Sequence, residues 1–374
     1  MVPNQDSKVR RPKHASTKKW FEVVLRLQLY EKLVPLLFAL LLAVVIVGII
    51  LLAYGANPLE AYVVILRGSF GSLGAASETF VKAIPMALCG LGVTIAFKTS
   101  MFNIGAEGQL LMGAMGGTLI GTTFYGLPAL LLFPVALAFS FLFGALWGAI
   151  PGVLRSKLDV NEIFVTLFMN YVAFYFVSYL VHGPWKDPTA FLPHSRILDP
   201  AVHLPIILPG TRLHAGMIIL ILLSALIYVL FSKTVLGYRI LLVGSSSKVA
   251  RFSGINIGKY IVIAMILSGG IAGLAGFSEV AGIHHRLRDD ISPAGYYGLG
   301  YGYLGIAVAL IGKLHPVGNL VASIFCAAII VGSNSLQLKL GVPVWISYVV
   351  IAVMVITVLT SDLLVRKLKL FTEA

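Results

Sequence analysis

The chain has 374 residues, of which 58% are hydrophobic and only 11% are charged, and its mean hydropathy is +0.94. Soluble domains carry about 25% charged residues, so this composition excludes an ordinary soluble domain. Several apolar runs exceed the roughly 18 residues that a helix needs to cross a bilayer. The sequence therefore predicts an all-α polytopic membrane protein. In a membrane protein, the side on which the basic residues lie matters more than their total. The net charge of +13 therefore does not indicate nucleic-acid binding.

The first segment, 1–32, is a basic tail that is too long and too basic for a secretory signal. Between Trp20 and Tyr30 the apolar residues recur near helical spacing, which is typical of a helix lying on the membrane surface. A disordered basic tail would explain the composition equally well. The segment is predicted to lie in the cytoplasm in either case.

A transmembrane domain is predicted over 33–361, followed by a cytoplasmic tail over 362–374. Its ten predicted spans are 33–54, 82–97, 101–125, 129–150, 162–181, 215–231, 260–278, 297–312, 317–334 and 344–361. Most of the 28 Lys and Arg residues then lie on one side, which the positive-inside rule assigns to the cytoplasm together with both termini. The predicted outer segments are 55–81, 182–214, 279–296 and 335–343. The second of these is rich in proline and is a candidate docking loop.

A first group of polar residues, Asn103, Glu107 and Gln109, lies inside the apolar stretch Ser100–Gly113. A carboxylate near the middle of a bilayer costs roughly 2.5–3.5 kcal/mol on insertion scales, so it normally faces protein or a water-filled cavity. We favour the start of a helix buried in the bundle. A cytoplasmic turn with a solvated Glu107 is the alternative.

Glycines recur at four-residue spacing in two ladders, Gly113-Gly117-Gly121 and Gly144-Gly148-Gly152. This spacing puts the members of each ladder on one helix face, where small residues allow close helix contacts in lipid. The ladders therefore predict packing rather than substrate contact. Cys89 and Cys326 lie in apolar spans and predict buried thiols, with neither a disulfide nor a metal site.

A second polar group lies at the start of the span 162–181. Asn161, Glu162, Thr166 and Asn170 recur at roughly four-residue steps and share one helix face. That face is expected to line a pathway and to bond an uncharged, hydroxylated substrate, because charged residues are scarce in the spans. Helix capping by Asp159 or Asn161 is the alternative, but it leaves Asn170 unexplained.

The longest inner segment, 232–259, contains a predicted short helix within Gly244–Ile255. Ser246 or Ser247 can cap its start, and Gly254 can end it. The residues Val249, Ala250 and Phe252 form an apolar patch beside Arg251. An ordinary surface helix and a docking helix are both consistent with this pattern.

Catalytic and nucleotide-binding motifs are missing from the sequence. The nearest approach to a P-loop, Gly254-Ile-Asn-Ile-Gly-Lys-Tyr260, has the wrong spacing and ends in tyrosine, so ATP binding by that route is excluded. His284-His285 with Asp289-Asp290 is a cluster of catalytic residue types, and it is predicted to be simply solvated. No catalytic residue, metal or cofactor is expected.

Several of these segments together resemble the permease subunits of ABC importers for nucleosides and simple sugars, which are related to the ribose and branched-chain amino acid permeases. The resemblance rests on Phe102-Asn-Ile-Gly-Ala-Glu-Gly-Gln109, on Asn161-Glu162 with Thr166 and Asn170-Tyr171, and on the segments Gly244–Gly254, Ile266–Gly276 and Gly305–Gly318. It implies that the polar residues of the first two motifs line the substrate pathway. It also implies that Gly244–Gly254 couples to an ATPase, with Ser246-Ser247 where the family usually has Asn-Pro.

The resemblance further implies a set of partners in a bacterial plasma or inner membrane. These are a separate ATP-binding cassette subunit, which binds the ATP, a second permease subunit, an extracellular or periplasmic substrate-binding protein, and membrane lipid. A faint echo of Met86–Phe97 in Ile266–Gly276 suggests an inverted repeat. An ion-coupled secondary transporter or channel is the main alternative function, and a membrane-embedded enzyme is the third.

Overall fold

The computed structural model describes residues 38–290 and 300–372, with side chains described as far as residue 361. Within these ranges the regular elements are helices, apart from isolated β-bridges. The α-helices are Phe38–Ala53, α2 (Pro58–Phe70), α3 (Leu73–Phe97), α4 (Ala106–Thr123), α5 (Ala129–Leu158), α6 (Glu162–His182), α7 (Gly216–Lys233), α8 (Val235–Ser245), α9 (Ser247–Phe252), α10 (Ile257–Glu279), α11 (Tyr301–Ile311), α12 (Pro316–Leu340) and α13 (Ile346–Thr372). A 3-10 helix, Pro200–Val202, and a π-helix, Val280–His284, complete the list. The prediction of an all-α protein is confirmed.

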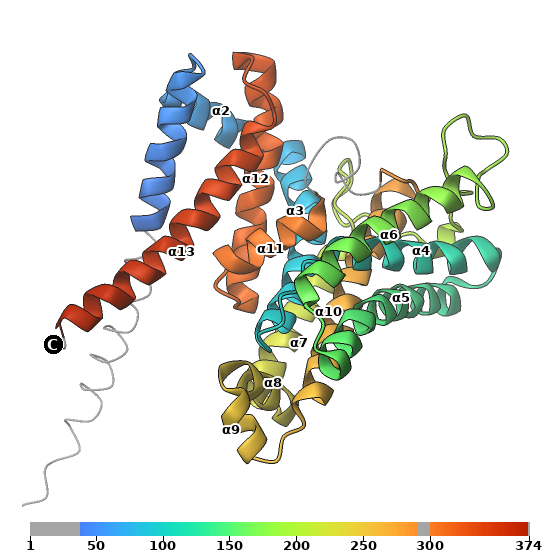
Figure 1. The fold of residues 1–374 in the computed structure, drawn as a ribbon. Helices are drawn as coiled ribbons and strands as arrows, with labels where there is room; N and C mark the ends of the chain where they lie inside the picture. The colour runs from blue at the N-terminus through green and yellow to red at the C-terminus, as the bar shows by residue number, and fades with distance from the viewer. Residues whose placement is uncertain (1–37, 291–299, 373–374) are drawn as a thin grey trace, which may run out of the picture.

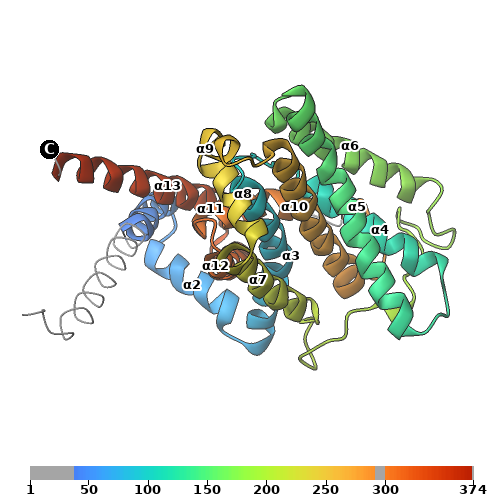
Figure 2. The same cartoon turned by 90° about the horizontal axis from the view of Figure 1, so that it is seen from below.

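The helices form two groups that meet at α3 (Figures 1 and 2). In one group α4, α5, α6 and α10 pack together, and in the other α2 packs against α12. The central α3 contacts α10, α11 and α12, and 83% of its most apolar window is buried. The short helices α8 and α9 project at one end of the molecule, called here the α9 end, and the segment 183–215 lies at the opposite end, called the loop end.

Fewer helices are suited to crossing a membrane than the ten predicted spans. Six described helices are long and apolar enough, or up to seven if the helix Phe38–Ala53 and α2, which meet at 110°, count as one broken span. Helix α4 fails on hydropathy because it contains Glu107 and Gln109 besides several glycines and threonines. It is buried among other helices, where it does not need an apolar surface. Helix α11 has only 11 residues, which is too short to cross about 30 Å. The prediction of ten spans is not confirmed.

Two predicted outer segments are largely helical, and their outer position stays a prediction. The segment 55–81 contains α2, capped by Asn57 and started by Pro58, and the first turns of α3, capped by Ser72. The segment 335–343 is mostly the end of α12, which stops at Gly341, where φ is +66°. The search for apolar runs missed these helices, because it considers only hydropathy and ignores capping residues such as Asn57 and Ser72. The predicted N-terminal tail and its interfacial helix lie outside the described residues.

Both glycine ladders pack helices closely, as predicted. A Cβ at Gly144 would lie 2.8 Å from the Gly273 Cα, and a Cβ at Gly152 would lie 2.9 Å from the Met265 Cβ. A Cβ at Gly113 would collide with the backbone of Gly273. Helices α4, α5 and α10 therefore meet backbone to backbone, and this contact holds α4 in place. Cys89 and Cys326 are free and buried.

Candidate functional site

The residues Met101–Gly105 leave α3 and enter α4 without forming a helix. The N-cap of α4 is Gly105, which has no side chain to accept from the free N–H groups of the first turn. Helix α6 supplies the missing acceptor, because the Gly108 N–H donates to Asn170 Oδ1 over 2.8 Å. The two polar groups found separately in the sequence are therefore parts of one contact.

Both the oxygen and the nitrogen of the Asn170 side-chain amide take part in this contact. Its Nδ2 donates to the Ile104 carbonyl oxygen at 2.9 Å and to the Tyr303 hydroxyl at 3.0 Å. One turn away, the Ile104 N–H donates to Thr166 Oγ1 at 3.3 Å. Thr166 and Asn170 thus share one face, as predicted, and that face binds the backbone entering α4.

Asn103 and Gln109 form a reciprocal amide pair. Asn103 Nδ2 donates to Gln109 Oε1 at 3.0 Å, and Gln109 Nε2 donates back to Asn103 Oδ1 at 3.2 Å. Asn103 also donates to Ser268 Oγ of α10 at 2.9 Å. Both amides are buried, and their hydrogen bonds to each other compensate for the loss of water.

Glu107 lies between the starts of two helices. It stands in the first turn of α4, and its Oε2 accepts from the Gly302 N–H at the start of α11 over 2.7 Å. The N-cap of α11, Gly300, has no side-chain capping bond, so the carboxylate takes that role. Helix N-termini carry partial positive charge, and two of them here face one carboxylate. Only 3% of Glu107 is exposed, which confirms the buried helix start and excludes the solvated turn.

Two substitutions should separate the charge of Glu107 from its hydrogen bonding. Glu107→Gln keeps the size and an acceptor, so we expect folding to be nearly intact and transport to change. Glu107→Leu leaves the Gly302 N–H without this acceptor, which costs about 1–3 kcal/mol for a buried group, so it should lower the thermal midpoint clearly. The midpoint of the solubilised protein and uptake by vesicles measure the two effects.

Glu60 provides the matched control, because it is also in the first turn of a helix, α2, but is exposed. Glu60→Leu should change the midpoint little. A Glu107→Leu protein as stable as Glu60→Leu would contradict the role of Glu107 as a cap. So would fast thiol labelling of a cysteine placed at position 107.

Glu162 and Asn161 begin α6. Asn161 caps the helix, with the Ile163 N–H donating to its Oδ1 at 2.9 Å, so of the two predicted caps it is Asn161 that acts. Glu162 is buried, accepts from the Phe102 N–H at 3.5 Å and lies 3.4 Å from Arg155 Nε. Capping and the polar face are therefore both present, and Glu162 joins the contact with the start of α4.

The structure thus brings together Asn103, Glu107, Gln109, Glu162, Thr166 and Asn170 around the start of α4, while Asn161 stays at the exposed edge. Their role in a substrate pathway stays a prediction. Sequence reasoning missed Ser268, Gly302 and Tyr303, which complete the network. The resembling segments Ile266–Gly276 and Gly305–Gly318 lay near these residues, but no local pattern connected them with Asn103 or Glu107.

The predicted short helix exists as α9, which has six residues. Ser246 caps it by accepting from the Val249 N–H at 3.3 Å, and Gly254, with φ of +72°, follows its end. The side chains of Val249 and Phe252 are 50% and 92% exposed, and Ser247 and Arg251 are exposed beside them. Ala250 was wrongly assigned to the exposed patch, because it is buried against Ile240, Val243 and Tyr260.

The prediction that the cluster of His284, His285 and two aspartates is simply solvated was wrong for the two histidines, whereas Asp290 is exposed. The His285 ring stacks on His203 with centroids 3.9 Å apart, and His284 Nε2 lies 3.5 Å from Glu279 Oε2. Burial and the nearby His203 lower the pKa of His285, which therefore stays neutral at pH 7. In the described part of the chain, no group of three or more His, Cys, Asp or Glu residues could hold a metal ion.

Comparison with known proteins identifies the family. Residues 75–359 match the family described as the permease component of the branched-chain amino acid transport system. A glucose ABC transporter permease of Haloferax volcanii is 34% identical, with 87% of each chain covered. A guanosine ABC transporter permease of Bacillus subtilis is 33% identical over 89% of this chain and 94% of its own, and a nucleoside ABC transporter permease of Lactococcus lactis is 29% identical over 86% and 89%. No solved structure matches the chain significantly.

The match runs from the first turn of α3 into α13. It therefore includes the network around the start of α4, helix α9 and the six single helices that are long and apolar enough to span a membrane. It confirms the resemblance that the motifs indicated. The chain belongs to the branched-chain amino acid transport permease family and is an integral-membrane permease subunit of an ABC importer.

Proposed function

We propose that this permease carries a nucleoside or a related simple sugar into the cell, driven by a separate ATPase that docks on α9. The three relatives named above are permeases for glucose, guanosine and nucleosides, which are uncharged and rich in hydroxyl groups. A path for such a ligand needs hydrogen-bonding groups rather than a full counter-charge. The buried network of amides and hydroxyls around α4 has that chemistry.

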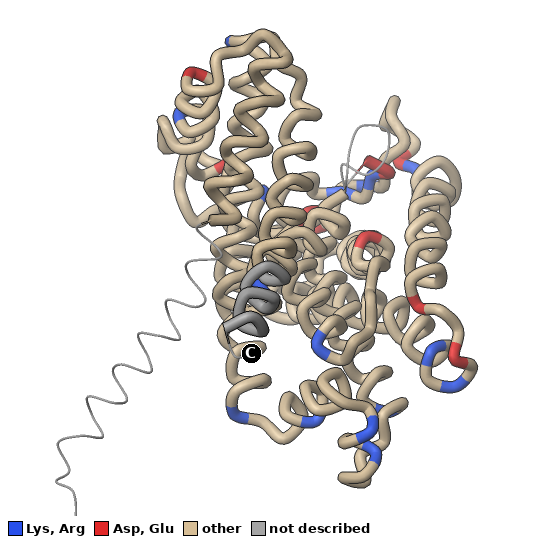
Figure 3. The backbone as a smooth tube through the Cα atoms, turned by 60° about the vertical axis from the view of Figure 1, so that its left-hand side comes forward, with Lys and Arg blue, Asp and Glu red and all other residues tan. Residues whose placement is uncertain are grey.

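The α9 end is proposed to face the cytoplasm. Among described residues it carries nine Lys and Arg and two acids: Lys98, Arg155, Lys157, Lys233, Arg239, Lys248, Arg251, Lys259 and Lys313, with Asp159 and Glu162. The loop end is mixed: Arg67, Lys82, Lys186, Arg196, Arg212, Arg286, Arg288 and Lys339, with Glu60, Glu78, Asp187, Asp199, Glu279, Asp289 and Asp290. Figure 3 shows this asymmetry, and the positive-inside rule assigns the basic end to the cytoplasm.

The observation that carries the docking proposal is Phe252, which is almost fully exposed on a short helix at the basic end. A helix of six residues is marginal in water and depends on its contacts. Its inner face, through Ala250, already packs on α8. Its outer face exposes Val249 and Phe252, and we propose that the ATPase docks there. The ATPase is also the subunit that binds the ATP.

The segment 183–215 at the opposite end is proposed to receive the extracellular binding protein. It is an ordered loop: the Gly126 and Ala201 N–H groups donate to the Asp199 carboxylate at 2.7 and 2.8 Å. These bonds lower the pKa of Asp199 and keep it charged. Phe191 at the same end is 99% exposed. A second permease subunit completes the proposed assembly.

Six of the seven predicted pathway residues are buried and have internal partners, so substrate contact requires an exchange of hydrogen bonds. Asn170, for example, would give up its bond to Tyr303 or to the Ile104 carbonyl for a substrate hydroxyl. We therefore place the pathway along the face where α4, α6 and α11 meet, with the network opening as the helices move.

Reconstitution tests the proposed function. Vesicles holding the permease, its ATPase and the second permease subunit, with the binding protein outside, should accumulate labelled guanosine or glucose only when ATP is enclosed. Vesicles with the permease alone and an ion gradient should not. Accumulation by the permease alone would instead favour the ion-coupled carrier.

A further inference from the structure

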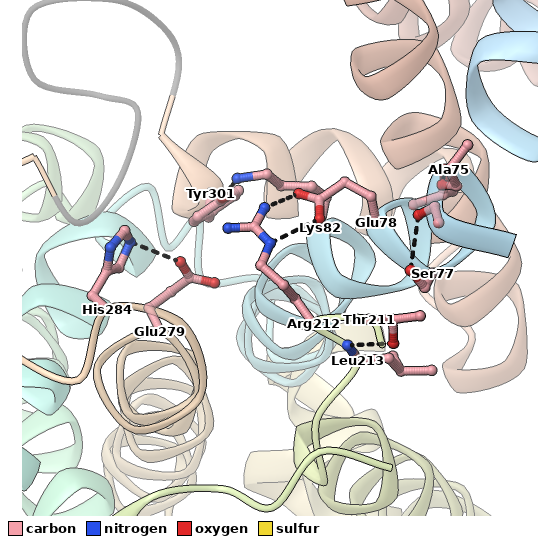
Figure 4. Close-up of polar contacts among 12 residues, drawn as sticks. Ala75, Ser77, Glu78, Lys82, Thr211, Arg212, Leu213, Glu279, His284 and Tyr301 are labelled. Atoms are coloured by element: carbon pink, nitrogen blue, oxygen red, sulfur yellow. Dashed lines mark hydrogen bonds and ion pairs between the residues drawn. The ribbon is translucent and has the colours of Figure 1, made fainter. Parts of the chain in front are cut away.

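A second group of polar side chains, distinct from the network around α4, lies at the loop end. Figure 4 shows these side chains converging from α3, the segment 183–215, the end of α10 and the start of α11. This loop-end cluster consists of Glu78, Lys82, Arg212, Glu279, His284 and Tyr301. Its outer edge is open to solvent, because the side chains of Arg212 and Glu78 are 58% and 27% exposed, whereas Glu279 and Tyr301 are buried.

Glu279 is the deepest charged member, and the imidazole of His284 is its described ion-pair partner. Its side chain is 3% exposed, yet no described residue donates a hydrogen bond to its carboxylate, and His284 Nε2 is 3.5 Å away. Buried carboxylates normally accept hydrogen bonds, since losing water without replacement costs several kcal/mol. Glu279 is therefore a buried acceptor that hydroxyl groups of a ligand could satisfy.

Lys82 supplies donors beside it. Its ammonium donates one hydrogen bond, to the Tyr301 hydroxyl at 2.7 Å, and has three N–H groups. Arg212 and Glu78 form a two-point ion pair in the same cluster, with the Arg212 Nε donating to Glu78 Oε2 at 3.1 Å. The cluster thus offers both donors and acceptors.

The charges of the cluster balance. When His284 is counted as uncharged, the cluster holds two carboxylates and two cations. It therefore has no net charge that would attract an anionic or a cationic ligand. A neutral ligand with hydroxyl groups can donate to the carboxylates and accept from the cations at once. This is the chemistry of a sugar or of the ribose of a nucleoside.

We propose that the loop-end cluster is an entry site that binds an uncharged, polyhydroxylated ligand as it leaves the binding protein. The proposal rests on the proposed function for its orientation and ligand class. The cluster also borders the first network, because Tyr301 is followed by Gly302, which donates to Glu107. A ligand that touches Tyr301 therefore contacts the residue next to Gly302, whose bond to Glu107 holds α11 against α4.

Direct binding tests the proposal. Labelled guanosine and glucose are titrated against the assembled permease–ATPase complex in nanodiscs without binding protein. We expect saturable binding of at least one of them, weakened about tenfold by Glu279→Gln and by Lys82→Met, which corresponds to 1.4 kcal/mol. Guanosine 5′-monophosphate should bind at least about tenfold more weakly than guanosine, since the two carboxylates of the cluster offset its two cations and leave no net positive charge for the phosphate.

Glu60→Gln is the control, because Glu60 is an exposed glutamate at the same end outside the cluster. The affinity of this variant for the labelled ligand should equal that of the wild type. Thermal midpoints identify any variant that fails to fold, and Lys82→Met decides the question if Glu279→Gln is such a variant. Absence of saturable binding, equal affinity of folded variants and wild type, or equal affinity for the monophosphate would overturn the entry site. ATP-driven uptake by the wild type would still stand in that event, whereas its absence would refute the proposed function itself.

Discussion

Phe252→Asp is expected to abolish ATP-driven uptake and substrate-stimulated ATP hydrolysis while the permease still inserts and folds. The side chain is 92% exposed in the free chain, so its loss costs the isolated permease little. Burying a phenylalanine contributes about 1.5–3 kcal/mol, and each 1.4 kcal/mol is a tenfold change in affinity. The aspartate also places an unpaired charge in the contact. Co-purification of the ATPase and its hydrolysis rate measure the effect.

Phe191 offers the matched control at the other end of the molecule, where it is 99% exposed. Phe191→Asp should leave the recovery of the ATPase unchanged. If the ATPase bound Phe252→Asp as well as it bound Phe191→Asp, α9 would not be the docking helix. The fold of the variant is checked by its thermal midpoint, which should match that of the wild type.

Gly273→Leu is expected to prevent correct folding. A Cβ at this position would lie 3.1 Å from the Gly144 Cα and would collide with the Ser140 carbonyl oxygen, and Gly113 of α4 packs on the other side. Overpacking of a core costs typically 1–3 kcal/mol, and here the obstructing atoms are backbone, which cannot rotate away. Helices α4, α5 and α10 would have to separate. The yield of monodisperse protein and its thermal midpoint measure the loss.

Gly74→Ala is the corresponding neutral change. Only the Ser72 Oγ, 3.9 Å away, lies within 4 Å of a Cβ at that position, and alanine favours helix more than glycine does. The variant should be as stable as the wild type or slightly more so. A Gly273→Leu protein with wild-type yield and midpoint would show that the helices can repack around the added side chain.

Local signals predicted α9 well. Its cap at Ser246 and its end at Gly254 depend on neighbouring residues only, and such signals are present in the sequence. Ala250 was misplaced because its burial depends on α8, against which the helix folds. Six residues have too few turns to show by their pattern which face is covered.

The buried position of Glu107 also followed from its apolar surroundings, but its partner did not. Gly302 is 195 residues away along the chain, and Asn170 is 62 residues from Gly108. Nothing in a local pattern indicates which distant helix supplies the missing hydrogen bonds. The same limit hid the loop-end cluster, whose members come from four parts of the chain, so that Lys82 and Arg212 looked like ordinary charges at the ends of spans.

The end of α8 rests directly on the turn between α3 and α4. A Cβ at Gly244 would collide with the backbone of Lys98, and Ser100, which has a φ of +59°, donates its hydroxyl to the Gly244 carbonyl oxygen at 2.8 Å. Residues 102–104 are not helical, and they are held instead by hydrogen bonds to Glu162, Thr166 and Asn170 of α6. We therefore expect a push on the α8–α9 arm to pass through the contact between Gly244 and Ser100 into this turn and to change the angle between α3 and α4.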